Sequence, residues 1–246
     1  MNPHCQHHRF VGRDGVGAVV CDRTRLDIDH FDRLDPGRWP GSVVVGSGGR
    51  GSAWFVEAEF GRGVLRQYRR GGLVARLITD RYLYLGERRV RSLREFALLC
   101  RMSELGLPVP RPLAAGYLRR GIAYRAAILV ERIESARSLA DQLRVSPDAP
   151  DWPAIGAALA QFHRCRVFHA DLNAHNILMD GAGQVHVIDF DRGRIMARPG
   201  RWCLATLARL RRSLARVRPD LDAGVLDERF ARLSAGYQAV LTGGHR

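Results

Sequence analysis

Short apolar stretches separated by glycines mark the first half of the chain and predict β-strands. Residues 43–45 are three consecutive valines, and residues 52–60 carry aromatic and β-branched side chains without a helix-capping residue. Runs of this kind, bounded by turn residues, are typical of strands. A further strand is expected from residue 64 onward, after the glycine-containing turn at 60–63, and another is expected over residues 127–133.

Apolar residues at helical spacing follow in four segments. Residues 88–105 have one apolar face and end at Gly106 before a proline-rich stretch, which is a strong helix terminator. Residues 138–143 begin with a serine, a preferred capping residue, and residues 155–165 carry a second apolar face. The connection between these two helices is punctuated by three prolines, at positions 147, 150 and 153. A last helix is expected from about Trp202.

Three polar residues in the second half have the spacing of a phosphoryl-transfer site. Asp171, which lies two positions after His169, is followed by Asn176, and Asp189 comes after the apolar pair 187–188 and precedes Phe190. An aspartate can accept the proton of the attacking hydroxyl, while the asparagine and the second aspartate hold Mg²⁺ against nucleotide phosphates. A capped polar loop and a buried strand ending in a turn would explain each half alone. Together and in this order they resemble the catalytic and metal loops of the protein-kinase-like superfamily.

This resemblance implies a two-lobed α+β fold that uses ATP and Mg²⁺. A small, mainly β lobe would cover residues 1–130, and a larger helical lobe would cover residues 131–246. A glycine-rich loop lies between two predicted strands, and the resemblance places it over the phosphates; its glycines are Gly46, Gly48, Gly49 and Gly51. A dinucleotide-binding fingerprint would instead need a helix after the glycines.

The basic residue expected to contact the phosphates is an arginine, because the chain contains no lysine among its 39 basic residues. Arg66 follows an apolar pair on a predicted strand and is the first candidate, with Arg69 or Arg70 as alternatives. Arginine keeps the charge of lysine but offers a forked set of donors. The partner carboxylate is expected on the helix over 88–105. Glu95 is the best candidate there; the alternatives are Glu87 and Glu104.

Departures from protein kinases point to a different acceptor. Ala170 replaces the arginine that would bind a phosphorylated activation loop, Asn173 replaces a lysine, and Asp191 replaces a glycine. The chain then passes from Asp191 to the helix near Trp202 without an A-P-E motif. Little room is left for binding a peptide, which favours a small-molecule or glycolipid hydroxyl. His169 is expected to brace the loop, and His175 is unassigned.

The net charge of +14 and the isoelectric point near 10.9 indicate an anionic partner. The helix after Trp202 is basic and amphipathic, which suits an anionic membrane; we favour a core-packed helix with a solvated basic face. Nucleic acid would fit the charge equally well, but no RNA-binding signature accompanies it. No apolar stretch approaches the 18 or so residues that span a bilayer, and the start has no signal-peptide core. Five scattered cysteines suggest thiols in a reducing cytosol.

Two further elements sharpen the resemblance. Residues 68–73 read YRRGGL and residues 83–86 read LYLG, and with the catalytic loop they resemble the Kdo kinase family of lipopolysaccharide core sugar kinases. Kdo is 3-deoxy-D-manno-octulosonic acid. The resemblance implies ATP-dependent phosphorylation of the 4-hydroxyl of Kdo on a Kdo–lipid A precursor (Kdo–lipid IVA), peripherally at the cytoplasmic face of the bacterial inner membrane. Arg69 and Arg70 would help to hold the anionic acceptor. No nucleic acid and no obligate protein partner are expected.

Other functions remain open from the sequence. The chain could be a core heptose kinase or a protein kinase, which a panel of acceptors would separate. It could also be a basic pseudokinase that binds anionic lipid or RNA without catalysis. The presence of Asp171, Asn176 and Asp189 together argues against this last reading, because a binding module has no need of all three.

Overall fold

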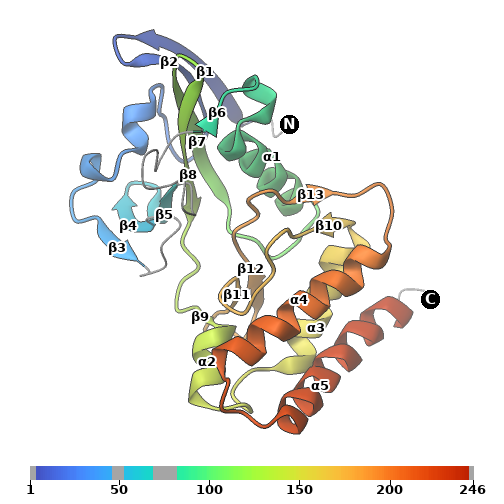
Figure 1. Ribbon diagram of the computed structural model, residues 1–246. Coiled ribbons are helices and arrows are strands. Elements are labelled where there is room, and N and C mark those ends of the chain that lie inside the picture. The colour runs from blue at the N-terminus through green and yellow to red at the C-terminus, as the bar shows by residue number, and fades with distance from the viewer. Residues whose placement is uncertain (1–3, 46–52, 69–81, 244–246) are drawn as a thin grey trace. The chain divides into compact units, whose positions relative to one another are not determined.

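A computed structural model describes residues 4–45, 53–68 and 82–243 of the chain (Figure 1). Two compact units are present. The strand unit comprises Met1–Arg101 and Arg111–Arg132, and the helical unit comprises Met102–Pro110 and Ile133–Arg246. A strand-rich unit and a helix-rich unit in one chain confirm the predicted α+β class.

The strand unit is built on an antiparallel sheet. Among the described residues its strand order is β1-β2-β7-β8-β5-β4-β3, with β6 also paired to β8. The strands are β1 (Cys5–Gly12), β2 (Gly15–Asp22), β3 (Val43–Val45), β4 (Ala53–Ala58), β5 (Gly61–Gln67), β6 (Tyr82–Leu83), β7 (Pro112–Arg120) and β8 (Ala123–Glu131). The strands predicted in the first half are therefore present. The β1–β2 hairpin and β7 were not predicted.

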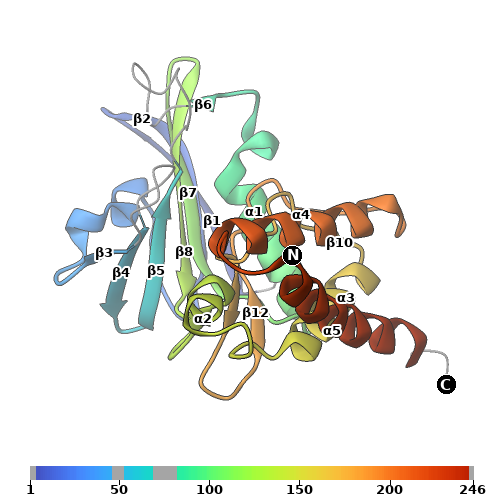
Figure 2. The same cartoon turned by 60° about the horizontal axis from the view of Figure 1, so that its bottom comes forward.

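Both faces of this sheet are covered. One face packs against the short helices η1 (Phe31–Leu34) and η2 (Pro36–Arg38), where Trp39 meets Phe60 edge-on with ring centroids 5.5 Å apart. The opposite face carries α1 (Arg91–Glu104), as Figures 1 and 2 show. The Ser92 hydroxyl donates to the backbone oxygen of Gly116 on β7 at 2.8 Å, which fixes the start of α1 on the sheet.

Helix α1 begins later than the predicted residue 88. A single 3₁₀ turn, η4 (Glu87–Arg89), occupies this stretch, and Val90 is extended with ψ of 126°. Because an extended residue interrupts the helical hydrogen bonds, the regular helix starts only at Arg91. The predicted end is close to that observed: Gly106 has a φ of 70°, a left-handed conformation that glycine adopts without strain.

The helical unit contains four longer helices and two small groups of strands among its described residues. The helices are α2 (Leu139–Val145), α3 (Trp152–Arg164), α4 (Arg201–Val217) and α5 (Ala223–Thr242). Strand β11 (Ile177–Met179) pairs with β12 (Val185–Val187) and with β9 (Arg137–Ser138), and β10 (Val167–Phe168) pairs with β13 (Arg194–Ile195). Helices α3 and α5 lie side by side (Figure 2). A Cβ atom at Gly156 would lie 1.9 Å from the backbone oxygen of Leu233, so glycine is required for this close approach.

Ser138 caps α2 as expected, accepting a hydrogen bond from the Asp141 amide at 3.1 Å. Pro153 was wrongly placed in a connection, since it lies in the first turn of α3, where proline is well tolerated because that amide has no helical partner. The predicted core-packed face of α4 is confirmed for its central leucines, whereas Leu204 is exposed; the buried ones are Leu207, Leu210 and Leu214.

His163 links α3 to α5 inside this unit. Its Nδ1 atom lies 2.8 Å from the hydroxyl of Tyr237, and its ring meets Trp202 edge-on. Burial disfavours the charged imidazolium and lowers the pKa of His163 to about 4. The neutral ring is therefore the form that the fold stabilises.

We expect acid to weaken this packing. An unfolded histidine has a pKa near 6.5, so between about pH 6.5 and 4 the unfolded chain binds a proton that folded His163 does not. The free energy of unfolding should fall as pH is lowered through this window, by up to about 3 kcal/mol at this site. Urea unfolding of His163→Gln should show a shallower pH dependence than the unaltered protein, whereas exposed His175→Gln should not. An unchanged slope in His163→Gln would exclude this role.

Candidate active site

The predicted catalytic residues lie in two adjoining segments of the helical unit. Asp171 and Asn176 occupy the loop between β10 and β11, and Asp189 follows β12. Strands β11 and β12 are antiparallel, and the Ile188 amide donates to the backbone oxygen of Asn176 at 3.0 Å. This pairing places Asn176 beside the residue that precedes Asp189. Asn176 and Asp189, which are thirteen positions apart in the sequence, are therefore brought into one local site.

His169 ties the two segments together. Its Nδ1 atom accepts the backbone amide of Asp171 at 3.1 Å, and its Nε2 atom lies 2.9 Å from the backbone oxygen of Ile188. A neutral ring protonated at Nε2 satisfies both contacts. Burial lowers the pKa of His169 and favours this neutral form. Both ring nitrogens are used within the loop, which fits the expectation that His169 braces it.

The Asp171 carboxylate is held on one side only. Arg209 of α4 donates to its Oδ1 atom through Nε at 3.0 Å and also through Nη2. No described residue donates to Oδ2, and the side chain is 39% exposed. A half-exposed carboxylate with one uncommitted oxygen can receive a proton from a bound hydroxyl.

Asn176 presents its amide oxygen. Its Nδ2 atom donates to the backbone oxygen of Asp171 at 3.0 Å, which leaves Oδ1 as an acceptor that no described residue uses. The residue is buried and its position is therefore fixed. The Oδ1 atom of Asn176 is therefore available as a ligand for a cation.

Asp189 has an unusual backbone conformation. Its φ of 62° lies in the left-handed region, which is uncommon for residues other than glycine and concentrates at functional sites. The next residue, Phe190, is 1% exposed. Its ring stacks on that of Phe162 of α3, with ring centroids 5.7 Å apart, and its centroid lies 4.7 Å from that of the His169 ring. Packing of this buried ring offsets the cost of the strained aspartate.

Two helices anchor the loop through a single residue. The Ala174 amide donates to the hydroxyl of Ser213 on α4 at 3.1 Å, and the Ala174 oxygen accepts the Ala140 amide at the start of α2 at 3.0 Å. Ala174 and Ser213 are both buried. The loop is thereby locked to the scaffold a few residues from Asp171.

The donor set fits Mg²⁺. The Asn176 amide oxygen and the Asp189 carboxylate are hard oxygen ligands, and Mg²⁺ in phosphoryl-transfer sites takes one or two such groups plus phosphate oxygens and water. Within the described part of the chain, no three His, Cys, Asp or Glu side chains converge to form a metal cage. The Asn176 and Asp189 oxygens together are a ligand pair that suits an ion bound along with a nucleotide.

The strand unit brings the predicted arginine and glutamate together. Arg66 on β5 donates through Nη2 to both carboxylate oxygens of Glu95 on α1, at 2.6 and 2.5 Å. The Glu95 side chain is only 3% exposed, and the Tyr68 hydroxyl donates to it as well. Glu87, one alternative, instead accepts from Tyr117 and pairs with Arg9. Arg66 and Glu95 thus form the contact expected of this pair.

Other predicted residues lie outside the described ranges. These are the glycines of the predicted phosphate loop and the two arginines of the YRRGG segment: Gly46, Gly48, Gly49, Gly51, Arg69 and Arg70.

Two residues of the site were missed from the sequence. Tyr68 was considered only as part of a motif, and Arg209 was assigned to a solvated basic face. Ser213 lies one helical turn after Arg209, and two polar residues at that spacing on one side of an amphipathic helix were the signal available.

Comparison with known proteins identifies the family of this chain. The sequence model of the lipopolysaccharide kinase (Kdo/WaaP) family matches residues 38–237. A protein of Xanthomonas euvesicatoria pv. vesicatoria (strain 85-10) is 48% identical over 225 residues, covering 91% of this chain and 90% of the relative. A Xylella fastidiosa (strain 9a5c) protein is 46% identical over 245 residues, covering 99% and 96%. A Stenotrophomonas maltophilia (strain R551-3) protein is 48% identical over 224 residues, covering 91% and 90%.

All three relatives are named 3-deoxy-D-manno-octulosonic acid kinase. The family match covers most of the chain, and the resemblance inferred from the motifs is confirmed. The chain is accordingly a phosphotransferase that acts on an alcohol group, and it belongs to the lipopolysaccharide kinase (Kdo/WaaP) family.

Proposed function

We propose that this protein transfers the γ-phosphoryl group of ATP to the 4-hydroxyl of Kdo on a Kdo–lipid A precursor, Kdo–lipid IVA. The observation that carries the proposal is the convergence of Asp171, Asn176 and Asp189 in one braced loop cluster. The names of the relatives support the choice of sugar. Arginine suits an acceptor with a sugar carboxylate and lipid phosphates, because it binds such groups through two parallel hydrogen bonds.

In this reaction the 4-hydroxyl oxygen forms a bond to the γ-phosphorus while the bond from that phosphorus to the β–γ bridging oxygen breaks. ADP leaves, and the hydroxyl proton passes to Oδ2 of Asp171. Asn176 and Asp189 would hold Mg²⁺, which when bound offsets negative charge on the phosphate oxygens. Arg66, positioned by Glu95, would bind the nucleotide phosphates.

The residues outside the described ranges have proposed roles as well. Backbone groups of Gly46, Gly48, Gly49 and Gly51 would cover the phosphates. Arg69 and Arg70 would bind the anionic acceptor.

The acceptor is tested with a matched panel. Kdo–lipid IVA should be phosphorylated, and the same glycolipid lacking the oxygen at position 4 of Kdo should not. A heptose-containing core acceptor and a generic protein substrate should remain unlabelled. Phosphorylation of the 4-deoxy acceptor would move the reaction to another hydroxyl, and preferential labelling of heptose or protein would replace the proposed substrate.

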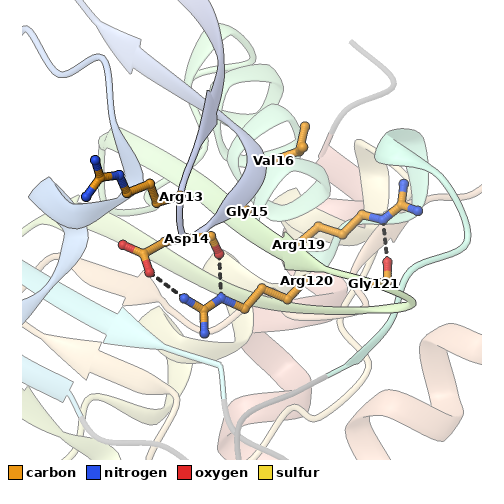
Figure 3. Close-up of a pocket in the computed structure, with 7 residues that line it drawn as sticks. All are labelled: Arg13, Asp14, Gly15, Val16, Arg119, Arg120 and Gly121. Carbon is orange, nitrogen blue, oxygen red and sulfur yellow. Dashed lines mark hydrogen bonds and ion pairs between the residues drawn. The ribbon is translucent and has the colours of Figure 1, made fainter.

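Peripheral contact with an anionic membrane, at its cytoplasmic face, is proposed because the acceptor is a lipid. No helix in the described ranges is both long and apolar enough to cross a bilayer. The turns of the β1–β2 and β7–β8 hairpins lie side by side, since Val16 pairs with Arg119 and Arg120 donates to the backbone oxygen of Asp14 (Figure 3). They form a hollow of about 500 Å³, whose lining includes three arginines and one aspartate: Arg13, Arg119, Arg120 and Asp14.

Apolar side chains project near these turns. Val11 is 84% exposed and Ile122 is 75% exposed. Basic residues near an anionic bilayer each contribute about 1 kcal/mol of attraction, and exposed apolar groups add by insertion at the interface. Charge complementarity therefore favours an anionic lipid surface as the occupant of these two turns.

Vesicle binding tests this surface directly. The paired change Val11→Asp with Ile122→Asp should reduce cosedimentation with phosphatidylglycerol-containing vesicles about tenfold, because it removes apolar contacts and adds negative charge. Val145→Asp, at a similarly exposed position, is the control and should bind normally. If Leu204→Asp on α4 abolished binding and the paired change did not, docking would belong to α4.

A further inference from the structure

Arg209 contacts the proposed proton acceptor, and the reaction described above gives it no role. Its Nε and Nη2 atoms both donate to Oδ1 of Asp171, the carboxylate proposed as the proton acceptor. The two residues are 38 positions apart and come from the catalytic loop and the middle of α4. No other described cation contacts this carboxylate.

The packing of α4 against the catalytic loop determines where this contact forms. Ser213, one turn after Arg209, accepts the Ala174 amide at 3.1 Å, so the same helix face touches the loop at two points. Leu210 and Leu214 next to them are fully buried. Because the helix is fixed by apolar packing and by a buried hydrogen bond, the backbone of Arg209 is held beside the loop that carries Asp171.

Side chains within the loop offer no substitute. Asn173 donates to the backbone oxygen of Asp171 at 3.0 Å and accepts the His175 amide at 2.9 Å, so its polar atoms serve the loop backbone. His169 is likewise committed at both nitrogens. Orientation of the Asp171 carboxylate about its last torsion therefore depends on Arg209.

We propose that Arg209 is the positioning residue of the reaction, which holds Asp171 through Oδ1 and so reserves Oδ2 for the acceptor hydroxyl. The proposal rests on the function given above. A guanidinium stays protonated in proteins, so Arg209 orients the base without competing for the transferred proton. Small misplacements of a reacting group cost on the order of 100-fold in rate.

The test compares variants in phosphoryl transfer with purified full-length protein. Arg209→Gln should lower kcat about 100-fold, while KM for ATP and for the acceptor changes less than about threefold, because only orientation is lost. Arg209→Lys should recover about tenfold of this loss, since it keeps the charge but not the fork. Arg211→Gln is the matched control: Arg211 lies on the same helix and makes a like contact, with Asp227 outside the site. The kcat of Arg211→Gln should equal that of the unaltered protein.

A double-variant comparison separates positioning from direct contact with phosphate. In an Asp171→Asn background, adding Arg209→Gln should change the residual rate by less than about twofold, because the group being positioned is already gone. A further 100-fold loss in that background would overturn the proposal, as would an unaltered kcat for Arg209→Gln alone. If the proposed substrate is wrong, the unaltered protein itself will be inactive on Kdo–lipid IVA, which distinguishes that outcome from failure of the Arg209 proposal. The variants are then compared on the core heptose acceptor.

Discussion

Replacement of Asp171 by asparagine is expected to reduce phosphoryl transfer by about 10³-fold while the fold is retained. The substitution keeps the shape of the side chain and an oxygen that can accept from Arg209, but it removes the basic oxygen that takes the hydroxyl proton. The loop itself should persist, because its bracing contacts come from the backbone, His169 and Ser213. Initial rates with labelled ATP, together with a thermal melt, measure both effects.

Asp227→Asn is the control for this prediction. Asp227 pairs with an arginine of α4 as Asp171 does, but it lies on α5 away from the loop. It should transfer phosphate at the unaltered rate. Full activity in Asp171→Asn would show that the proton acceptor is another group, and the residue roles proposed here would then be wrong.

Replacement of Arg66 by alanine should damage both stability and nucleotide binding. Glu95 is 3% exposed and Arg66 is 25% exposed, so loss of the arginine removes a charged partner from a buried carboxylate that also accepts from Tyr68. Removing one partner of a buried ion pair costs on the order of 3 kcal/mol. The same change removes the proposed phosphate contact and should raise KM for ATP about tenfold or more. Urea unfolding and ATP titration measure the two losses.

A second substitution separates these two effects. Arg66→Ala combined with Glu95→Gln removes the buried charge, so most of the unfolding free energy should return, whereas ATP binding should remain weak. Arg66→Lys keeps a cation and should stay within about tenfold of the unaltered kcat/KM for ATP. Normal ATP binding by the double variant would show that Arg66 has only a structural role.

Local patterns predicted the site better than long-range ones. Asp171, Asn176 and Asp189 lie within a short segment that the antiparallel pair β11–β12 closes. Their spacing in the sequence is therefore enough to predict that they lie close together. Glu95 could be selected as a candidate because the kinase resemblance requires a glutamate on the helix predicted over residues 88–105, where Glu95 lies. Arg209 was not, because its contact joins residues 38 positions apart and its helix looks like an ordinary basic surface helix.

The unpredicted elements have physical reasons too. Strand β1 carries polar residues at several positions and buries few side chains, so its apolar alternation is weak; β2 beside it is mostly buried. Helix α5 buries only three side chains, Leu226, Leu233 and Tyr237. Its contact with α3 depends on close backbone approach at Gly156 and Gly236, and helical periodicity does not report such contacts.

The most direct measurement of the central claim is transfer of labelled phosphate from ATP to purified Kdo–lipid IVA by the unaltered protein, with Mg²⁺ and with EDTA. The proposed chemistry predicts label on the 4-position of Kdo with Mg²⁺ and none with EDTA. Absence of label on the glycolipid in the presence of Mg²⁺, from protein that still binds ATP, would contradict the proposed substrate; absence of ATP binding would contradict the kinase chemistry itself.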